Sequence, residues 1–217
     1  YMIDLAREII AEQGDRFLSL VPEQAASELG AIGRAKLVAQ ARETLAAMGI
    51  TFDCWFSEQS LFDSSQVTRV LELLRERGYV EEREGAVWFT SSALGESKDN
   101  VLVRSNGAPT YFASDIAYHY NKLVVRGFDR AIDVWGADHA GHVPRMKAAM
   151  VALGLDPERL SILIHQMVTL KRGQEIVRMS KRTGDIVELR EVIDEVGADA
   201  ARFFFLSRSA DAHMDFD

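Results

Sequence analysis

The strongest constraint on the fold is a pair of apolar segments, AIDVW (131–135) and LSILIHQMV (160–168), with a helical segment between them. Both are short and rich in β-branched residues, so each predicts a buried strand, and only Asp133 interrupts the first. The segment PRMKAAMVALG between them has Pro144 in its first turn and Gly154 at its end, as helices often do. Strand, crossover helix and strand within about 40 residues predict a parallel βαβ unit with a right-handed crossover.

The segments before this unit read differently. Helical periodicity covers 2–12 and the stretch from Pro22 to about Met48, and ITFDCWF (50–56) reads as a strand. Serines 64 and 65 are suited to begin a helix that Gly78 ends. We further expect a β-hairpin over 79–89 with Gly85 in the turn, one over 101–112 around Asn106-Gly107, and a helix over about 115–125.

Composition excludes several classes of protein. The 217 residues include 47% hydrophobic and 27% charged residues, enough for a sizeable core, and the net charge of −8 argues against a general nucleic-acid coat. Cys54 is the single cysteine, which excludes an internal disulfide and fits a reducing cytoplasm. No apolar run approaches the roughly 18 residues of a transmembrane span, so we expect a cytoplasmic protein without a membrane partner.

Two polar stretches follow the predicted strands, at the edge where parallel sheets bind ligands. GADHAGH follows the strand ending at Trp135, and KRGQEIVRMSKR follows the strand ending near Val168. The second stretch contains a single acid, Glu175, and five cationic residues that are suited to hold a polyphosphate. Neither GxxxxGK nor GxGxxG occurs, and a solvated basic loop is the alternative. The five are Lys171, Arg172, Arg178, Lys181 and Arg182.

Order and spacing point to a family. Met179-Ser180-Lys181, downstream of a Gly-x-Asp-His turn, resembles the second signature of class I aminoacyl-tRNA synthetases, Lys-Met-Ser-Lys-Ser. Arg178 and Arg182 depart from its first and last positions. Longer blocks then resemble the arginyl-tRNA synthetases of bacterial type, across nearly the whole chain. These blocks are FDCWFSEQSLFDSS, VLVRSNGAPTYFASDIAYH, FDRAIDVWGADHAGHVPRMKAAM, VRMSKRTGD and VGADAARFFFLSRSADAHMDFD.

The resemblance implies an α/β fold: part of a Rossmann-like parallel sheet, the second half of a class I catalytic domain. We expect a helical segment with a core strand at 1–56, an inserted small α+β unit at 57–106, and the signature-bearing half at 107–217. The implied reaction joins arginine to tRNA(Arg) at the expense of ATP, with Mg²⁺ accompanying the ATP. The family generally needs bound tRNA before it activates arginine, and we expect no obligate protein partner.

The resemblance also assigns roles to residues. Lys181 would stabilise the ATP phosphates while the arginine carboxylate attacks, and Met179, Ser180 and Arg182 would shape its loop. Tyr111 and Asp115, four residues apart on one helix face, would bind the arginine guanidinium, and His139 would also reach the amino acid. The ATP-binding residues would be Gly136, Asp138 and His142 at the ribose and His165, Met167 and Val168 near the adenine.

Each assignment has an alternative reading. Asp138, His139 and His142 together would suit a metal ion, which would make the chain a metal-dependent hydrolase. Asp115 could simply cap a helix, and Tyr111 could belong to the core at a strand end. We assign Tyr118 and His119 to helix packing and Trp135 to the core.

HAGH (139–142) also fits the first class I signature, His-x-Gly-His, but that signature belongs after the first strand of the fold. We therefore expect the true one to lie upstream of Tyr1, and the anticodon-binding domain to follow Asp217. On that interpretation the isolated chain is folded but inactive and binds tRNA poorly. The rivals are the metal-dependent hydrolase, a non-catalytic nucleotide-binding module, and a synthetase for another amino acid.

Overall fold

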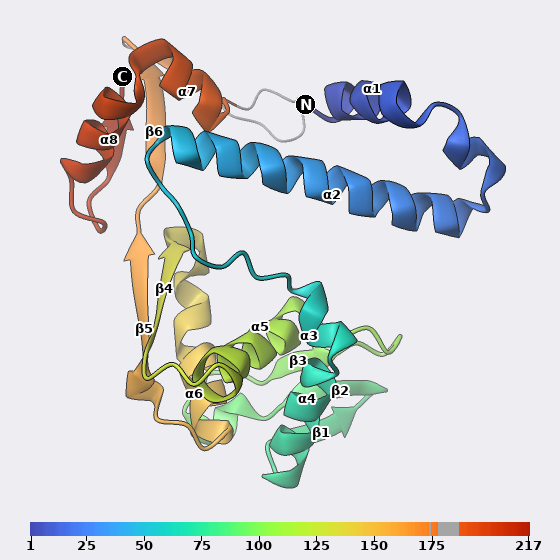
Figure 1. Cartoon of the computed structure of the whole chain (residues 1–217). Coiled ribbons are helices and arrows are strands. Elements are labelled where there is room, and N and C mark those ends of the chain that lie inside the picture. The colour runs from blue at the N-terminus through green and yellow to red at the C-terminus, as the bar shows by residue number, and fades with distance from the viewer. Residues whose placement is uncertain (174, 178–186) are drawn as a thin grey trace. The chain divides into compact units, whose positions relative to one another are not determined.

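The computed structural model describes residues 1–173, 175–177 and 187–217, in two compact units (Figure 1). The first consists of Tyr1–Asp53 and the described part of Arg178–Ser207, and the second of Cys54–Val177 and Arg208–Asp217. Among the described residues, no helix is long and apolar enough to cross a membrane. The expected boundaries at 56/57 and 106/107 stay a prediction.

Helices make up the first unit. It contains α1 (Met2–Gln13), the short η1 (Arg16–Ser19), α2 (Pro22–Ala47), α7 (Leu189–Val196) and α8 (Ala198–Leu206). Pro22 stands in the first turn of α2 and Gly49 follows its end with φ +68°, which confirms that helix. A small core forms between the end of α2 and the two C-terminal helices, from Met48, Ile193 and Ala201.

The strand expected over 50–56 is wrong, because no strand forms there. The Ile50 N–H instead bonds to the carbonyl of Leu45 at 2.9 Å, completing the end of α2, and Ile50 packs on the small core. Phe52 is 57% exposed. The β-branched and aromatic composition was therefore misleading, since a strand also needs a neighbour to pair with.

The second unit begins with the helices α3 (Gln59–Asp63) and α4 (Gln66–Glu76). An antiparallel sheet follows, made of β1 (Val80–Arg83), β2 (Ala86–Phe89) and β3 (Asn100–Val103), with the short η2 (Ser91–Leu94) before β3. The hairpin over 79–89 is confirmed, with left-handed turn residues Glu84 and Gly85 (φ 51° and 75°). The 101–112 hairpin forms only in part: the Asn106-Gly107 turn is present, but Val103–Pro109 is the one bridge described on its return arm.

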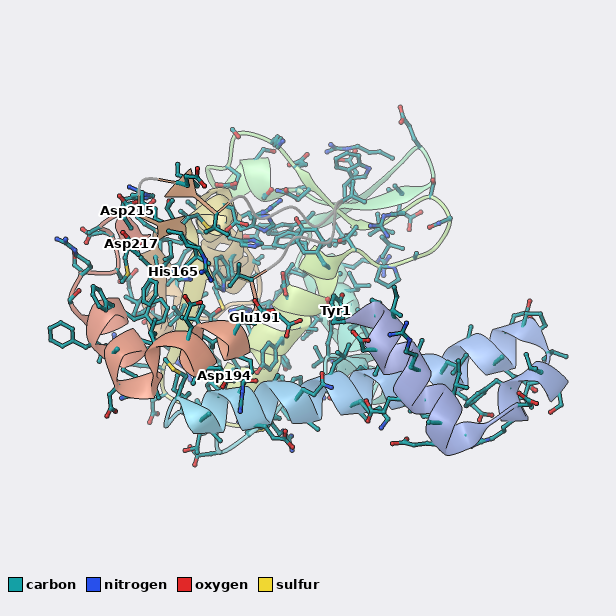
Figure 2. The ribbon with its side chains drawn as sticks, turned by 90° about the horizontal axis from the view of Figure 1, so that it is seen from above. Tyr1, His165, Glu191, Asp194, Asp215 and Asp217 are labelled. Carbon is teal, nitrogen blue, oxygen red and sulfur yellow. The ribbon has the colours of Figure 1, made fainter. Side chains whose placement is uncertain are left out.

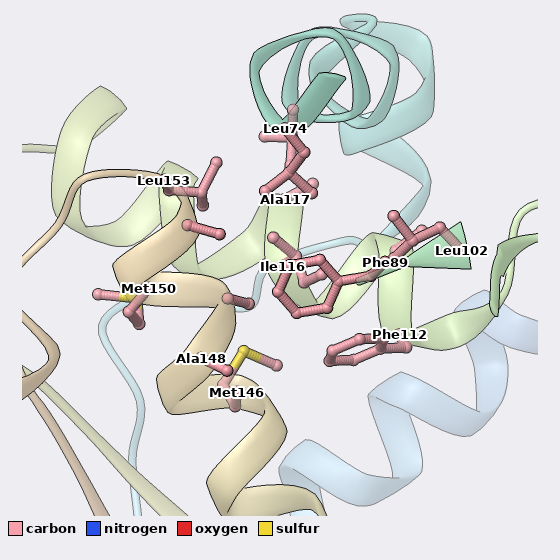
Figure 3. Packing of buried hydrophobic residues seen from close by; sticks show 14 of the residues in the cluster. Leu74, Phe89, Leu102, Phe112, Ile116, Ala117, Met146, Ala148, Met150 and Leu153 are labelled. Carbon is pink, nitrogen blue, oxygen red and sulfur yellow. The ribbon is translucent and has the colours of Figure 1, made fainter. Parts of the chain in front are cut away.

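The predicted βαβ unit is confirmed as parallel. The unit follows α5 (Tyr111–Tyr120) and the π-helical turn η3 (Asn121–Val125). Its two parallel strands are β4 (Ala131–Gly136) and β5 (Leu160–His165). Between them lie η4 (Ala137–His142), α6 (Val143–Ala152) and η5 (Pro157–Arg159). α5 begins at Tyr111 rather than near Asp115. The main core packs α4, α5 and α6 around Phe89, Ile116 and Met146 (Figure 3).

The apolar segment 160–168 is not one strand. β5 ends at His165, and β6 (Val168–Arg172) begins another sheet with β7 (Glu175–Ile176) and β8 (Met214–Phe216). The β4–β5 pairing ends at His165, and the next N–H, that of Gln166, donates to the Ala210 carbonyl oxygen at 2.8 Å. The first part of the basic stretch is thus strand rather than loop, and its Lys171 ammonium pairs with the Asp215 carboxylate at 2.5 Å. Figure 2 labels Asp215 and also His165.

Candidate active site

A polar pocket of about 470 Å³ lies in the second unit, between one face of α5 and the strand β4 with the turn η4 that follows it. Its lining includes all three predicted arginine-binding residues and, from the predicted ATP-binding set, His142. Its walls combine carboxylates, imidazoles, an ammonium group and aromatic rings. The lining residues are Tyr111, Asp115, Tyr118, His119, Lys122, Ile132, Asp133, Val134, Trp135, His139 and His142.

A larger hollow of about 920 Å³ lies in the first unit, between α1 and α2. Its lining is predominantly aliphatic, with Leu5, Ile9 and Leu37 among the contributing side chains. Catalysis and recognition of a charged substrate need several converging polar groups, whereas Asp15 and Arg34 are the charged residues in this largely aliphatic lining. Volume alone therefore does not identify the site, and the smaller polar pocket is the candidate.

The helix α5 places the two predicted arginine-binding residues on one face. Thr110 occupies the position before the helix, so the capping alternative for Asp115 is wrong. Tyr111 is 57% exposed at the first helical residue, so its core alternative is wrong too. Burial raises the pKa of the half-buried Asp115 carboxyl, with the nearby Glu58 carboxylate adding to the rise. Within the described residues, no hydrogen-bond or ion-pair partner is recorded for that carboxyl.

The turn after β4 carries the predicted ribose-binding residues. A Cβ added to Gly136 would lie 2.6 Å from Oδ1 of Asp138, so any larger residue here would displace the Asp138 side chain from its present position. The imidazole Nε2 of His142 lies 3.1 Å from the Tyr111 hydroxyl, which joins the turn to the start of α5. Burial first, then the charge of Arg145 and the neighbouring His139, lower the pKa of His142.

The metal alternative lacks a ligand set. Among the residues that the structure describes, no three His, Cys, Asp or Glu side chains are grouped to hold a metal ion. Asp138 and His139 approach each other at 3.6 Å, whereas His142 turns its ring nitrogen to Tyr111. In the described structure the Asp-His-x-x-His stretch thus forms the turn η4, with its side chains directed to different partners.

The remaining nucleotide-site predictions lie at the end of β5. Gly136 and His165 are register partners, so the carboxyl ends of the two parallel strands meet, as such a site requires. His165 and Met167 are exposed, Val168 is half-buried as the first residue of β6, and the His165 Nδ1 lies 3.1 Å from the Gln166 carbonyl oxygen. The signature residues Met179, Ser180, Lys181 and Arg182 fall outside the described residues.

The sequence interpretation missed a buried ionic cluster on the floor of the pocket. Asp133 of β4 accepts from His119 Nε2 at 2.6 Å and from Lys122 Nζ at 2.7 Å. Burial alone would raise the pKa of the Asp133 carboxyl, but the hydrogen bonds and charges of its two partners outweigh burial and lower it. The signal available in the sequence was the single acid inside an otherwise apolar strand.

Two aromatic residues pack as expected and also line the pocket. Trp135, assigned to the core, is half-buried and packs against the main core, and its ring meets that of His139 edge-on at 6.5 Å. Tyr118, assigned to helix packing, stacks on Phe56 and also lines the pocket, where Lys122 Nζ lies 4.4 Å from its ring centroid. The lysine is therefore held by a carboxylate and by an aromatic face.

Comparison with known proteins gives a consistent result. The sequence model described as tRNA synthetases class I (R), catalytic domain, matches residues 6–208. The arginine–tRNA ligase of Dehalococcoides mccartyi is 56% identical over 217 residues, and that of Carboxydothermus hydrogenoformans 54% over 216, with the whole chain covered in each case. This chain spans only 39% of the length of either relative.

Solved structures agree. A Campylobacter jejuni structure named as an arginyl-tRNA synthetase superposes with a TM-score of 0.88 at 39% identity, covering 100% of this chain and 46% of that one. The Thermus thermophilus arginyl-tRNA synthetase, at 18% identity and a TM-score of 0.67, shares the fold over 99% of this chain and 46% of its own. The chain therefore belongs to the family of class I arginyl-tRNA synthetase catalytic domains.

Proposed function

We infer that the chain is the arginine- and ATP-binding part of an enzyme that joins arginine to tRNA(Arg). The observation that carries the proposal is Asp115, a half-buried carboxyl with a raised pKa, beside Tyr111 in a pocket of about 470 Å³. A guanidinium offers a planar fork of donors to a carboxylate and a flat face to an aromatic ring. An arginine side chain in this pocket would supply the direct ion-pair partner that the Asp115 carboxyl lacks among the described residues.

ATP would bind at the paired carboxyl ends of β4 and β5. Gly136 would allow close approach of the ribose, and Asp138 and His142 would bond its hydroxyls. The arginine carboxylate would attack the α-phosphorus, pyrophosphate would leave, and Lys181 would stabilise the charge that develops on the phosphates. Mg²⁺ would arrive with ATP and be held chiefly by phosphate oxygens, as is usual for this ion.

The proposal assigns the complete reaction to a full-length protein rather than to these 217 residues. The chain spans 39% of the relatives it matches, and its net charge of −8 is unsuited to strong tRNA contact by itself. We propose that 107–217 form the second half of a Rossmann-like domain and that 57–106 form an inserted α+β unit. We further propose that the isolated chain neither activates arginine nor charges tRNA.

The test is an aminoacylation assay on the full-length protein that contains this chain, with total tRNA, ATP and each amino acid separately. Arginine alone should be charged, and Lys181→Ala should lower kcat by roughly 10²–10³-fold, the usual cost of removing one stabilising group from a transition state. The 217-residue chain is assayed in parallel and should be inactive.

Charging of a different amino acid would identify another synthetase, and charging of none would favour a nucleotide-binding module. Arginylation by the isolated chain would refute only the proposal that it is inactive. An unchanged kcat in Lys181→Ala would remove that residue's role while leaving the family membership intact.

A further inference from the structure

The His119 ring makes two contacts that lead from the pocket wall to the strand beneath it. Its Nδ1 lies 2.7 Å from the main-chain carbonyl oxygen of Asp115, and its Nε2 lies 2.6 Å from Oδ2 of Asp133. The first contact is to a residue one helical turn earlier on α5, and the second is to β4. One buried side chain thereby ties the helix that carries Asp115 to the strand that leads into the nucleotide turn.

The chemistry of the partners fixes the direction of both hydrogen bonds. A carbonyl oxygen only accepts, and the Asp133 carboxylate, whose charge Lys122 also neutralises at 2.7 Å, accepts as well. Both ring nitrogens of His119 therefore donate, which makes the ring an imidazolium. Charge-assisted hydrogen bonds of this kind are shorter and stronger than neutral ones, and burial strengthens them further.

The cluster is shielded from water, which separates it from ordinary surface ion pairs. The side chains of His119 and Asp133 are 4% and 7% exposed, and that of Lys122 is 17% exposed. A contact with so little solvent around it resists rearrangement, because each charge would be left buried and unpaired if its partner moved. The peptide group of Asp115 is consequently held at a fixed distance from β4.

We propose that His119 is a positioning residue for substrate recognition: by bonding the Asp115 peptide to Asp133, it holds the Asp115 carboxylate where it meets the guanidinium of arginine. The inference rests on the proposed function. Binding to a carboxylate that is already in place avoids the cost of ordering it. Loss of the His119–Asp115 bond should therefore weaken arginine binding while leaving ATP binding nearly unchanged.

Two substitutions separate positioning from simple stabilisation. In His119→Asn the amide nitrogen stands near the place of Nδ1 and keeps the bond to the Asp115 carbonyl, but the side chain is too short to reach Asp133. In His119→Gln the amide nitrogen stands near the place of Nε2 and keeps the bond to Asp133, but loses the bond to Asp115. The two variants thus divide the chain of hydrogen bonds at different points.

The experiment measures KM for arginine, KM for ATP and thermal stability for the full-length protein and both variants. His119→Gln should raise the KM for arginine roughly tenfold, because small misplacements of a binding group are costly. It should be the more stable of the two variants. His119→Asn should be less stable, yet have a KM for arginine closer to that of the unchanged protein.

A purely structural role predicts the opposite order, with the less stable His119→Asn having the higher KM for arginine. Lys147→Met is the matched control, since the ammonium of the half-buried Lys147 bonds the Pro157 and Leu160 carbonyls at the other end of β5. It should lower stability without changing the KM for arginine. A KM for arginine that follows stability in all three variants, or that is unchanged in both His119 variants, overturns the inference.

Two further outcomes are separable. If the unchanged protein charges no arginine, the proposed function fails and this inference falls with it. If either His119 variant is unfolded, hydrogen exchange on the unchanged protein decides. The amides of 115–119 should exchange slowly before arginine is added, whereas fast exchange that slows only with arginine would show that substrate, and not His119, orders the helix.

Discussion

Two ionic clusters in this chain have mirror-image charge patterns and almost the same distances, but very different surroundings. On the floor of the pocket, the Asp133 carboxylate lies between two cations, His119 and Lys122, at 2.6 and 2.7 Å. Between α1 and α2, the Lys36 ammonium lies between two carboxylates, each at 2.6 Å. The Asp133 side chain is 7% exposed, whereas the two carboxylates around Lys36 are 45% and 46% exposed.

The difference teaches that distance does not set the energy of an ion pair. Around Lys36, water can solvate Glu8 and Glu12 if the contact opens, so each charge loses little. Around Asp133 little water can reach the charges, so removing one member of the cluster leaves the others buried without a charged partner. The buried cluster can therefore hold Asp115 in place, whereas the exposed cluster adds little to the stability of the contact between α1 and α2.

The largest effect should come from neutralising the centre of the buried cluster. Asp133→Asn leaves His119 and Lys122 with uncompensated positive charge, and should lower the free energy of unfolding by about 3–5 kcal/mol. Chemical denaturation at neutral pH measures this difference. A loss no larger than that of an exposed pair would contradict the contrast between the two clusters.

The same substitution also predicts a pH dependence. The pKa of Asp133 is lowered in the folded protein, so its stabilising effect is present above the unfolded value of about 3.9 and is lost as pH falls through the folded value. The stability difference between the unchanged protein and Asp133→Asn should therefore hold through mildly acidic pH and shrink below about pH 4. A difference that grows on acidification would show that the carboxylate does not carry it.

A smaller effect, confined to the nucleotide side of the pocket, should follow from Gly136→Ala. The added Cβ would meet Oδ1 of Asp138 at 2.6 Å, and this short side chain can turn away at little cost to stability. Asp138 would then leave the position proposed for ribose binding. We expect the KM for ATP to rise several-fold, on the order of 1 kcal/mol of binding, with the KM for arginine unchanged. Equal changes in both KM values would mean that the two sides of the pocket are not separate.

The smallest effect should come from the exposed cluster. Lys36→Met removes the ammonium but keeps most of the aliphatic stem, and water can take over the solvation of Glu8 and Glu12. Thermal unfolding should hardly change, and neither should either KM. A loss of stability approaching that of Asp133→Asn would show that solvent exposure is not what distinguishes the two clusters.

Many boundaries of helices and turns in this fold follow from proline and glycine residues in the sequence. Pro22 and Gly49 bound α2, Gly85 stands in the turn of the β1–β2 hairpin, and Gly154 follows α6. Each of these residues has a backbone preference that acts without tertiary partners. The failures occur where partners decide: 50–56 has strand composition but no strand beside it, and 160–168 breaks because its backbone leaves one sheet for another.

The pocket shows the same division. The spacing of Tyr111 and Asp115 was sufficient to place both on one helix face, because helical periodicity is local. The contacts of Asp133 are with residues 11 and 14 positions away, in η3 and α5, and no local pattern specifies them. An acid inside an apolar strand indicates that it has polar partners. Only the packing of the unit shows that His119 is one of these partners.

The most direct test of the account is the kinetics of the Asp115→Asn variant of the full-length protein, with its thermal stability measured alongside. Burial raises the pKa of Asp115, so the ionised carboxyl costs the folded protein stability at neutral pH, a cost relieved as pH falls through the raised value. The neutral amide should therefore be as stable as the unchanged protein, or more so. It should raise the KM for arginine by roughly 30-fold or more, about 2 kcal/mol, since the guanidinium loses its charged partner. The KM for ATP should hardly change. An unchanged KM for arginine in a folded protein would contradict the assignment of this pocket to arginine.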